Sequence, residues 1–182
     1  MCKSTGGVSI KMIYEPAEDS YLLQQTLEKE NLNKDTKILE IGVGSGFILN
    51  FLKEKGFENI SGIDINQKAV DFCKKNKLNV WKSDLFENVV GNYDIIIFNP
   101  PYLPKDKKED QESQLATTGG KKGSEIINKF LIQTKNHLNT GGIIYLLISS
   151  LTQGVDYLNF KKKTISEKPL FFEKLQVLKL EL

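Results

Sequence analysis

The residues with the clearest chemical potential form one short stretch, Asn99-Pro100-Pro101-Tyr102. They follow residues 93–98, a nearly continuous apolar run that is typical of a strand buried on both faces of a parallel sheet. Pro100 would end this strand, because proline has no N–H to donate to a neighbouring strand. The stretch therefore places a carboxamide, backbone carbonyls and an aromatic ring at the carboxyl end of a strand, where ligands bind in open α/β sheets.

These residue types suit methyl transfer to a planar nitrogen, whose lone pair is delocalised and weakly nucleophilic. The side-chain oxygen of Asn99 can accept one N–H of such a group, and the backbone carbonyl of Pro100 can accept the other. Tyr102 can stack on the planar group. Holding both hydrogens directs the lone pair at the methyl group, so catalysis would come mainly from positioning and hydrogen bonding. The alternative is that Asn-Pro-Pro only terminates the strand.

A second polar segment, residues 14–20, is expected to open a helix that continues to about residue 31. Pro16 suits a first helical turn, and Glu18 and Asp19 complement the positive end of the helix dipole. The segment is either a well-started surface helix or a rim that contacts a ligand. As a rim, it would add Tyr14 and Pro16 to Asn99, Pro100, Pro101 and Tyr102 as residues that bind the acceptor.

A glycine-rich turn, residues 42–46, lies between the first expected strand and the next helix. Such a turn lets a ligand approach the backbone closely. It departs from the dinucleotide fingerprint, because Phe47 occupies the place of the third glycine. Glu40 lies just before the turn, where a carboxylate would repel a pyrophosphate but attract a cation.

Three acidic residues, Glu40, Asp64 and Asp84, lie at the tips of successive expected strands. Asp64 could accept hydrogen bonds from ribose hydroxyls and Asp84 from an adenine amino group, while side chains next to them clamp the ring. S-adenosylmethionine fits this arrangement, because it carries a sulfonium and an ammonium and no phosphate. The alternative is that these acids are helix N-caps. The residues expected to bind the cofactor are Glu40, Gly42, Gly44, Gly46, Asp64, Ile65, Asp84 and Leu85.

Composition indicates a soluble globular chain of one domain, residues 1–182, with 40% hydrophobic and 26% charged residues. No apolar run approaches the ~20 residues of a membrane span, and no signal core begins the chain, so a cytoplasmic location is expected. Cys2 and Cys73 lack a metal-binding spacing, and no metal is expected.

All 25 basic residues are lysine and the net charge is +2. This counts against nucleic-acid recognition, although a genome-wide lysine bias would have the same result.

Apolar patterns alternate between strands and helices, which predicts an α/β, doubly wound, mostly parallel sheet with an antiparallel edge strand. The tail, residues 172–182, is expected to supply edge strands. Residues 105–122 are expected to form a charged loop. Strands are predicted at 37–41, 60–65, 78–81, 93–98 and 143–148. Helices are predicted at 47–55, 67–75, 126–138 and 151–160. Gly141-Gly142 is expected to end the third of these helices, and the fourth is expected to lead into a basic turn at 161–163.

The chain resembles the HemK family of class I S-adenosylmethionine-dependent methyltransferases over most of residues 12–150. The resemblance is carried by residues 14–20, 39–46, 64–66, 69–70, 83–86, 99–104 and 119–123. It implies a seven-stranded Rossmann-like sheet, an N-terminal helical extension (1–33) that covers the cofactor site and a substrate-side loop (105–122). It also implies cofactor contacts from Ser20, Glu40, Gly42, Asp64, Asp84, Leu85 and Asn99.

Members of this family methylate N5 of the glutamine in the Gly-Gly-Gln loop of peptide-chain release factors. The chain resembles the short archaeal and eukaryotic branch, which works with a small zinc-binding activator subunit. Two other functions stay open. One is methylation of adenine N6 or another exocyclic amine of RNA or DNA, because the Asn-Pro-Pro-Tyr motif is shared with such enzymes. The other is a non-catalytic scaffold that only binds an adenosyl ligand, which an intact motif argues against.

Overall fold

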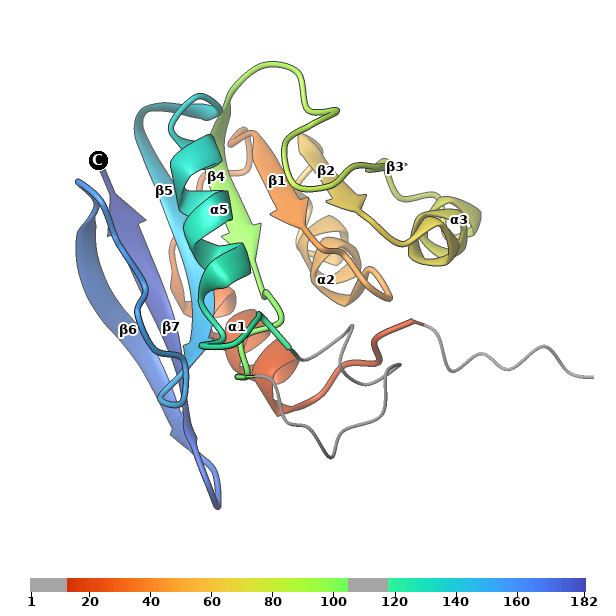
Figure 1. The fold of residues 1–182 in the computed structure, drawn as a ribbon. Helices are drawn as coiled ribbons and strands as arrows, with labels where there is room; N and C mark the ends of the chain where they lie inside the picture. Colours follow the sequence, from red (N-terminus) through yellow and green to blue (C-terminus); the bar gives the residue numbers. More distant parts are fainter. Residues whose placement is uncertain (1–12, 105–117) are drawn as a thin grey trace, which may run out of the picture.

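Seven strands form one sheet in the order β3-β2-β1-β4-β5-β7-β6 (Figure 1). The computed structural model describes residues 13–104 and 118–182. The parallel strands are β1 (Ile38–Ile41), β2 (Ile60–Asp64), β3 (Val80–Lys82), β4 (Tyr93–Phe98) and β5 (Leu138–Ser149). At one side β7 (Lys174–Glu181) and β6 (Lys161–Pro169) add antiparallel pairs. The predicted fold class is therefore confirmed.

Helices cover both faces of the sheet (Figure 1). They are α1 (Glu18–Lys29), α2 (Phe47–Glu54), α3 (Gln67–Lys75) and α5 (Glu125–Thr134). Side chains of β4 alternate between two core clusters, because successive residues of a strand point to opposite faces. Ile95 and Ile97 pack with α1 and α2, whereas Ile96 and Phe98 pack with α5. This alternation explains why the strand before Asn99 is apolar throughout.

The predicted helix at 126–138 is too long. The observed α5 ends at Thr134, and Gly141 and Gly142 lie inside β5. The register between β4 and β5 shifts there, since Tyr93 pairs with Leu138 but Ile95 pairs with Ile143. Gly141 has a φ of 74° within this irregularity. The glycines therefore serve a bulged strand and do not stop a helix.

The predicted helix at 151–160 is wrong, because residues 150–160 form turns and irregular backbone. Gly154 and Leu158 have φ values of 74° and 52°, which an α-helix excludes. The expected basic turn at 161–163 is also wrong, since these lysines begin β6. They lie on the outermost strand, where charged side chains discourage pairing with another chain.

The C-terminal strand is not an edge. It pairs with β5 on one side and β6 on the other, and its residues Leu175, Val177, Leu178 and Leu180 are almost fully buried. The antiparallel edge of the sheet is therefore β6. Within the described ranges, no helix has the length and apolar character to cross a bilayer.

Candidate active site

The glycine turn after β1 has a backbone that requires glycine. Gly42, Gly44 and Gly46 have φ values of 67°, 50° and 74°. A Cβ on Gly46 would lie 2.6 Å from Leu78 Cδ1 and 2.9 Å from Cys73 Sγ. The turn is therefore packed against the elements beside it, and its backbone is fixed at the carboxyl end of β1.

Asp64, at the end of β2, organises this turn. Its carboxylate accepts hydrogen bonds from the N–H groups of Gly44 at 2.9 Å and Asn66 at 2.7 Å. Burial raises the pKa of Asp64, and these backbone donors oppose the rise. The expectation that an acid lies at this strand tip is correct, and part of its role is to hold the backbone around it.

Glu40 is buried beside the turn, with 5% of its surface exposed. Within residues 13–104 and 118–182, its Oε2 atom has no hydrogen-bond partner. Burial raises the pKa of Glu40 well above its usual range, and the charge of Asp64 adds to this, while the N–H of Leu49 opposes it. A cationic or N–H-donating ligand would form a hydrogen bond with the free oxygen. Its charge would also offset the unfavourable effect of burial and of Asp64 on the ionised form of Glu40.

The acceptor side of the site is built around Asp19, a residue of the first turn of α1 that is 4% exposed. Its Oδ2 accepts the Tyr14 hydroxyl at 2.7 Å, the Asn99 amide nitrogen at 3.1 Å and the Tyr102 hydroxyl at 3.4 Å. Its Oδ1 accepts the N–H and hydroxyl of Ser20 at 2.6 Å and 3.2 Å. We call Tyr14, Asp19, Asn99 and Tyr102 the Asp19 cluster.

The cluster fixes the orientation of the Asn99 side chain. An ionised carboxylate only accepts hydrogen bonds, so the NH2 group of Asn99 must face Asp19. The Oδ1 atom then points away from Asp19, where it is buried and has no partner among the described residues. This leaves the acceptor atom that the sequence predicts as catalytic available to a ligand.

The hydroxyl groups of Tyr14 and Tyr102 stay protonated. Burial raises the pKa of both, and the negative charge of Asp19 raises it further. They can therefore act as hydrogen-bond donors to the carboxylate throughout the ordinary pH range.

The loop after β4 is held from outside by other segments. The Tyr102 carbonyl accepts the Thr152 hydroxyl at 2.9 Å, and the Leu103 carbonyl accepts the Gly119 N–H at 3.0 Å. A Cβ on Gly119 would overlap the Pro101 carbonyl, and one on Gly123 would overlap the Tyr102 carbonyl. The backbone of residues 119–123 therefore packs directly against the predicted catalytic stretch. This close contact leaves no room for side chains at Gly119 and Gly123.

A family model described as the methyltransferase small domain matches residues 15–168. The chain belongs to the methyltransferase small domain family. It is an S-adenosylmethionine-dependent methyltransferase, as the sequence predicts. The buried free oxygen of Glu40 fits a cofactor that carries positive charge and N–H donors.

Relatives of this methyltransferase support the HemK resemblance. The chain is 45% identical to the putative protein N5-glutamine methyltransferase MJ0928 of Methanocaldococcus jannaschii, covering 92% of this chain and 86% of that one. It is 34% identical to the eRF1 methyltransferase catalytic subunit mtq2 of Schizosaccharomyces pombe, covering 74% and 71%. The Mtq2 structure from the E. cuniculi Mtq2-Trm112 complex superposes with a TM-score of 0.76 at 25% identity, covering 93% and 98%.

Other predicted cofactor residues of this methyltransferase have different surroundings. Asp84 is not part of the buried acid pair, because its side chain is 41% exposed and accepts the Lys129 ammonium at 3.2 Å. Leu85 is buried and has a φ of 47°, a strained value for a branched residue. Ile65 is 62% exposed. Asp84 and Ile65 are thus accessible from solvent, whereas Glu40 and Asp64 are not.

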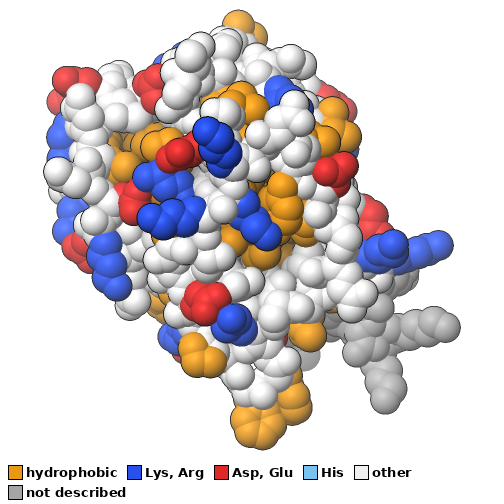
Figure 2. Space-filling model, turned by 90° about the vertical axis from the view of Figure 1, so that its left-hand side faces the viewer, with side chains coloured by type: hydrophobic (Ala, Val, Ile, Leu, Met, Phe, Trp, Pro, Cys, Tyr) orange, Lys and Arg blue, Asp and Glu red, His pale blue; other side chains and the backbone are white. Residues whose placement is uncertain are grey.

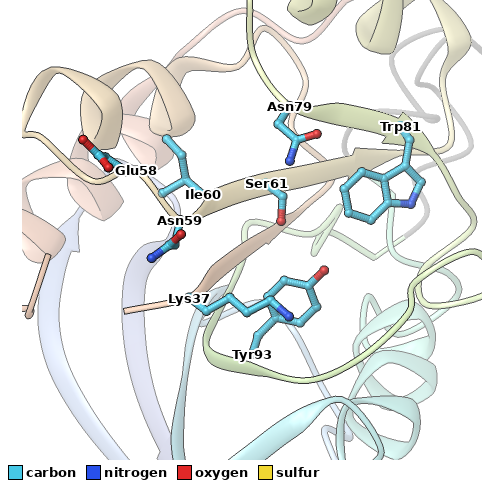
Figure 3. A pocket seen from close by; sticks show the side chains of 8 residues that line it. All are labelled: Lys37, Glu58, Asn59, Ile60, Ser61, Asn79, Trp81 and Tyr93. Carbon is cyan, nitrogen blue, oxygen red and sulfur yellow. The ribbon is translucent and has the colours of Figure 1, made fainter. Parts of the chain in front are cut away.

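A cavity of about 460 Å³ lies elsewhere in this methyltransferase (Figure 3). Its lining comes mostly from the amino ends of the parallel strands, namely Lys37, Glu58, Asn59, Ile60, Ser61, Asn79, Trp81 and Tyr93. The glycine turn and Asn99 lie at the opposite, carboxyl ends. This cavity is therefore separate from the candidate active site, and Trp81 lines it instead of the glycine turn.

Sequence reasoning missed one residue of the site. The acidic character of Asp19 predicted a helix-dipole role, but the structure brings it to Asn99, 80 residues away in the chain. A usable signal was present, since Asp19 lies between Tyr14 and Ser20 in the segment that was also interpreted as a ligand-contacting rim.

Proposed function

We propose that the chain methylates N5 of the glutamine in the Gly-Gly-Gln loop of a peptide-chain release factor. One observation carries the proposal: the amide group of Asn99 is held by Asp19 so that its oxygen is buried and unpaired. Such an oxygen suits an incoming amide N–H. The names of the M. jannaschii and S. pombe relatives support a glutamine acceptor in a protein. A role in translation termination also supports the proposal of a cytoplasmic location.

The reaction requires the lone pair of the acceptor nitrogen to point at the methyl group of the cofactor. S-adenosylmethionine, when bound, supplies a methyl group on a positively charged sulfur. Asn99 Oδ1 accepts one hydrogen of the glutamine amide, and the Pro100 carbonyl accepts the other. The nitrogen lone pair then faces the methyl group, while Tyr102 and Pro101 contact the amide plane. Formation of the N–C bond would break the bond between the methyl carbon and sulfur, leaving S-adenosylhomocysteine, and the nitrogen would release one proton to solvent. These hydrogen bonds strengthen as positive charge develops on nitrogen, so they favour the transition state over the ground state.

The two buried acids, Glu40 and Asp64, accept hydrogen bonds from different parts of the cofactor. Glu40 provides an acceptor for a cationic or N–H group, and Asp64 has acceptor capacity left for ribose hydroxyls beside the N–H groups it already binds. Gly42, Gly44 and Gly46 allow close approach to the backbone. Ile65 and Leu85 flank the adenine, Asp84 accepts from its amino group and Ser20 completes the wall near Asn99.

The test is a competition between substrates. The enzyme is incubated with methyl-labelled cofactor, a release factor and bulk RNA together. We expect label only on the release factor, and peptide mass spectrometry should locate it on the Gly-Gly-Gln glutamine. A release factor with that glutamine changed to alanine is the matched control and should stay unlabelled. Label on RNA and none on protein contradicts the proposal.

We further propose that a small zinc-binding subunit associates with this chain. Support comes from the E. cuniculi relative, which was solved as an Mtq2-Trm112 complex. In the described part of the chain, β3 is only three residues long and pairs on one side only, and the cavity of Figure 3 opens next to Trp81. Co-expression should give a 1:1 complex by light scattering, and Trp81→Lys should weaken it without changing cofactor affinity. Full activity of the isolated chain argues against the subunit.

A further inference from the structure

The turn between β6 and β7 displays two aromatic side chains to solvent. Phe171 is 92% exposed and Phe172 is 84% exposed, and their rings form an edge-to-face pair with centroids 4.6 Å apart. In Figure 1 this turn extends beyond the carboxyl ends of the parallel strands, and in Figure 2 hydrophobic side chains protrude at the bottom of the face. Side chains this exposed contribute almost nothing to the hydrophobic core of the fold.

The turn is nevertheless held in place. The Leu170 N–H donates to the Glu173 carbonyl at 2.7 Å, which closes it. At its base, the Lys174 N–H donates to the Ser150 hydroxyl at 2.9 Å, and Lys168 forms an ion pair with Glu18 of α1. Leu175 and Val177 pack in the same core cluster as α1. The backbone that carries the two aromatic residues is therefore held relative to the first turn of α1, which carries Asp19.

The last residue of the turn, Glu173, connects it to the acceptor site. Its Oε2 atom is buried and has no partner within the described segments. Its negative charge contributes to the raised pKa of Tyr14 and Tyr102, after burial and Asp19. Glu173 thus places an unsatisfied acceptor on the hairpin that packs against α1, the helix that carries Asp19.

We propose that residues 170–173 are the docking surface for the polypeptide segment that carries the acceptor glutamine. Phe171 and Phe172 cover an apolar side chain next to the acceptor, and Glu173 accepts an N–H of the same segment. This inference rests on the proposed function, because it requires a protein substrate. Exposed aromatic rings beside a buried, unpaired acceptor are typical of a polypeptide-binding surface. The carboxylates of Glu173 and Asp19 would disfavour a nucleic-acid phosphate beside the acceptor, whereas Glu18 is paired with Lys168.

The experiment compares the double variant F171A/F172A with Phe72→Ala. Phe72 is an exposed aromatic residue of α3, 40% exposed, and serves as the matched control. With the release factor as substrate, the double variant should raise KM roughly tenfold or more, as for an interface anchor, with kcat and cofactor affinity unchanged. With a tripeptide of Gly-Gly-Gln alone, which lacks any apolar side chain next to the acceptor, the double variant and the unmodified enzyme should have the same kinetics.

Glu173→Gln is the second variant, since it keeps the shape and removes the charge. It should raise the same KM by roughly threefold to tenfold, as for a lost charge-assisted hydrogen bond. An unchanged KM in both variants, or a fall in kcat at unchanged KM, overturns the docking surface while methylation by the unmodified enzyme still supports the proposed function. If the unmodified enzyme labels no release factor, the proposed function fails and the inference fails with it. A rise in KM for RNA alone also overturns it.

Discussion

At the scale of single residues, the site depends on one carboxylate that holds another side chain in place. Asp19 accepts the NH2 group of Asn99 and the hydroxyls of Tyr14 and Tyr102 on a single oxygen atom. Asp19 thus acts as a positioning residue for Asn99. Its removal would let the Asn99 amide rotate, and its oxygen would no longer be directed at the acceptor.

Asn99→Ala should lower kcat at least ~1000-fold, to a residual rate that remains measurable, and change cofactor affinity by less than roughly tenfold, because the lost hydrogen bonds act mainly in the transition state. Asp19→Ala should lower kcat by roughly a hundredfold for the same reason. If Asp19 acts through Asn99, the double variant D19A/N99A should be no slower than N99A alone. Steady-state kinetics and calorimetric titration of the cofactor measure both quantities. Independent, additive losses would contradict the positioning role.

Glu40→Gln should stabilise the cofactor-free protein at neutral pH and weaken cofactor binding. The folded-state pKa of Glu40 is raised, so its contribution to stability is fully present below the ordinary glutamate pKa and is lost as pH rises through the folded pKa. Glutamine does not ionise, so the variant does not lose this stability as pH rises. The Tm of the variant should therefore exceed that of the unmodified protein at neutral pH, and the difference should shrink towards acidic pH. Cofactor Kd should rise at least ~10-fold, as for a charge-assisted hydrogen bond. If the variant and the unmodified protein bind the cofactor with the same Kd, Glu40 does not contact the cofactor.

At the scale of elements, two turns rich in glycine position the chemistry. The first, between β1 and α2, is packed against Cys73 of α3 and Leu78, so it belongs to the core as well as to the proposed cofactor site. The second, residues 119–123, supports the Asn-Pro-Pro-Tyr loop through backbone contacts. In both, the absence of a side chain is what brings neighbouring segments close enough.

Gly46→Ala and Gly56→Ala separate packing from backbone strain. Both glycines have positive φ, at 74° and 84°, but a Cβ on Gly56 would meet nothing within 4 Å. Gly56→Ala should therefore cost only strain, about 1 kcal/mol of unfolding free energy. Gly46→Ala should cost ~1–3 kcal/mol more through overlap with Leu78 and Cys73. Urea unfolding measures both, and equal losses would show that the turn is loosely packed.

At the scale of the whole molecule, α1 connects the antiparallel side of the sheet to the site. Its first turn supplies Asp19, and the residue that ends it, Glu30, accepts the Tyr145 hydroxyl of β5 at 2.8 Å and the Lys179 ammonium of β7 at 3.0 Å. These hydrogen bonds lower the pKa of Glu30, although burial opposes them. The position of the Asp19 cluster therefore depends on contacts at the far end of the helix.

Glu30→Gln should lower the Tm at neutral pH. A carboxylate with a lowered folded-state pKa contributes stability above its unfolded pKa and loses it as pH falls through the folded value, so the difference from the unmodified protein should vanish in acid. Glu28→Gln is the control, because the Glu28–Lys55 pair is exposed and should contribute little. Melting curves from pH 3 to pH 8, roughly spanning the glutamate range, measure both. A pH-independent difference would assign the effect to packing.

The sequence by itself determined the features that local pattern and residue chemistry encode. Apolar runs identified β1, β2 and β4, because strands buried on both faces need them. The prolines after Phe98 marked the end of β4, and the glycines with the acids Glu40 and Asp64 indicated a cationic cofactor. Each inference needs only a few consecutive residues, whose backbone preferences and charges do not depend on distant partners.

Only the tertiary structure decided how distant segments meet. The hydrogen bond between Asp19 and Asn99, and the ion pair between Lys168 and Glu18 that joins the β6–β7 hairpin to α1, connect residues that are far apart in the chain. The errors at Leu138 and at 161–163 have the same cause, because these residues pair with β4 and β7 and sheet hydrogen bonds outweigh local preference. Residues 151–160 are different, since they form turns and irregular backbone between β5 and β6.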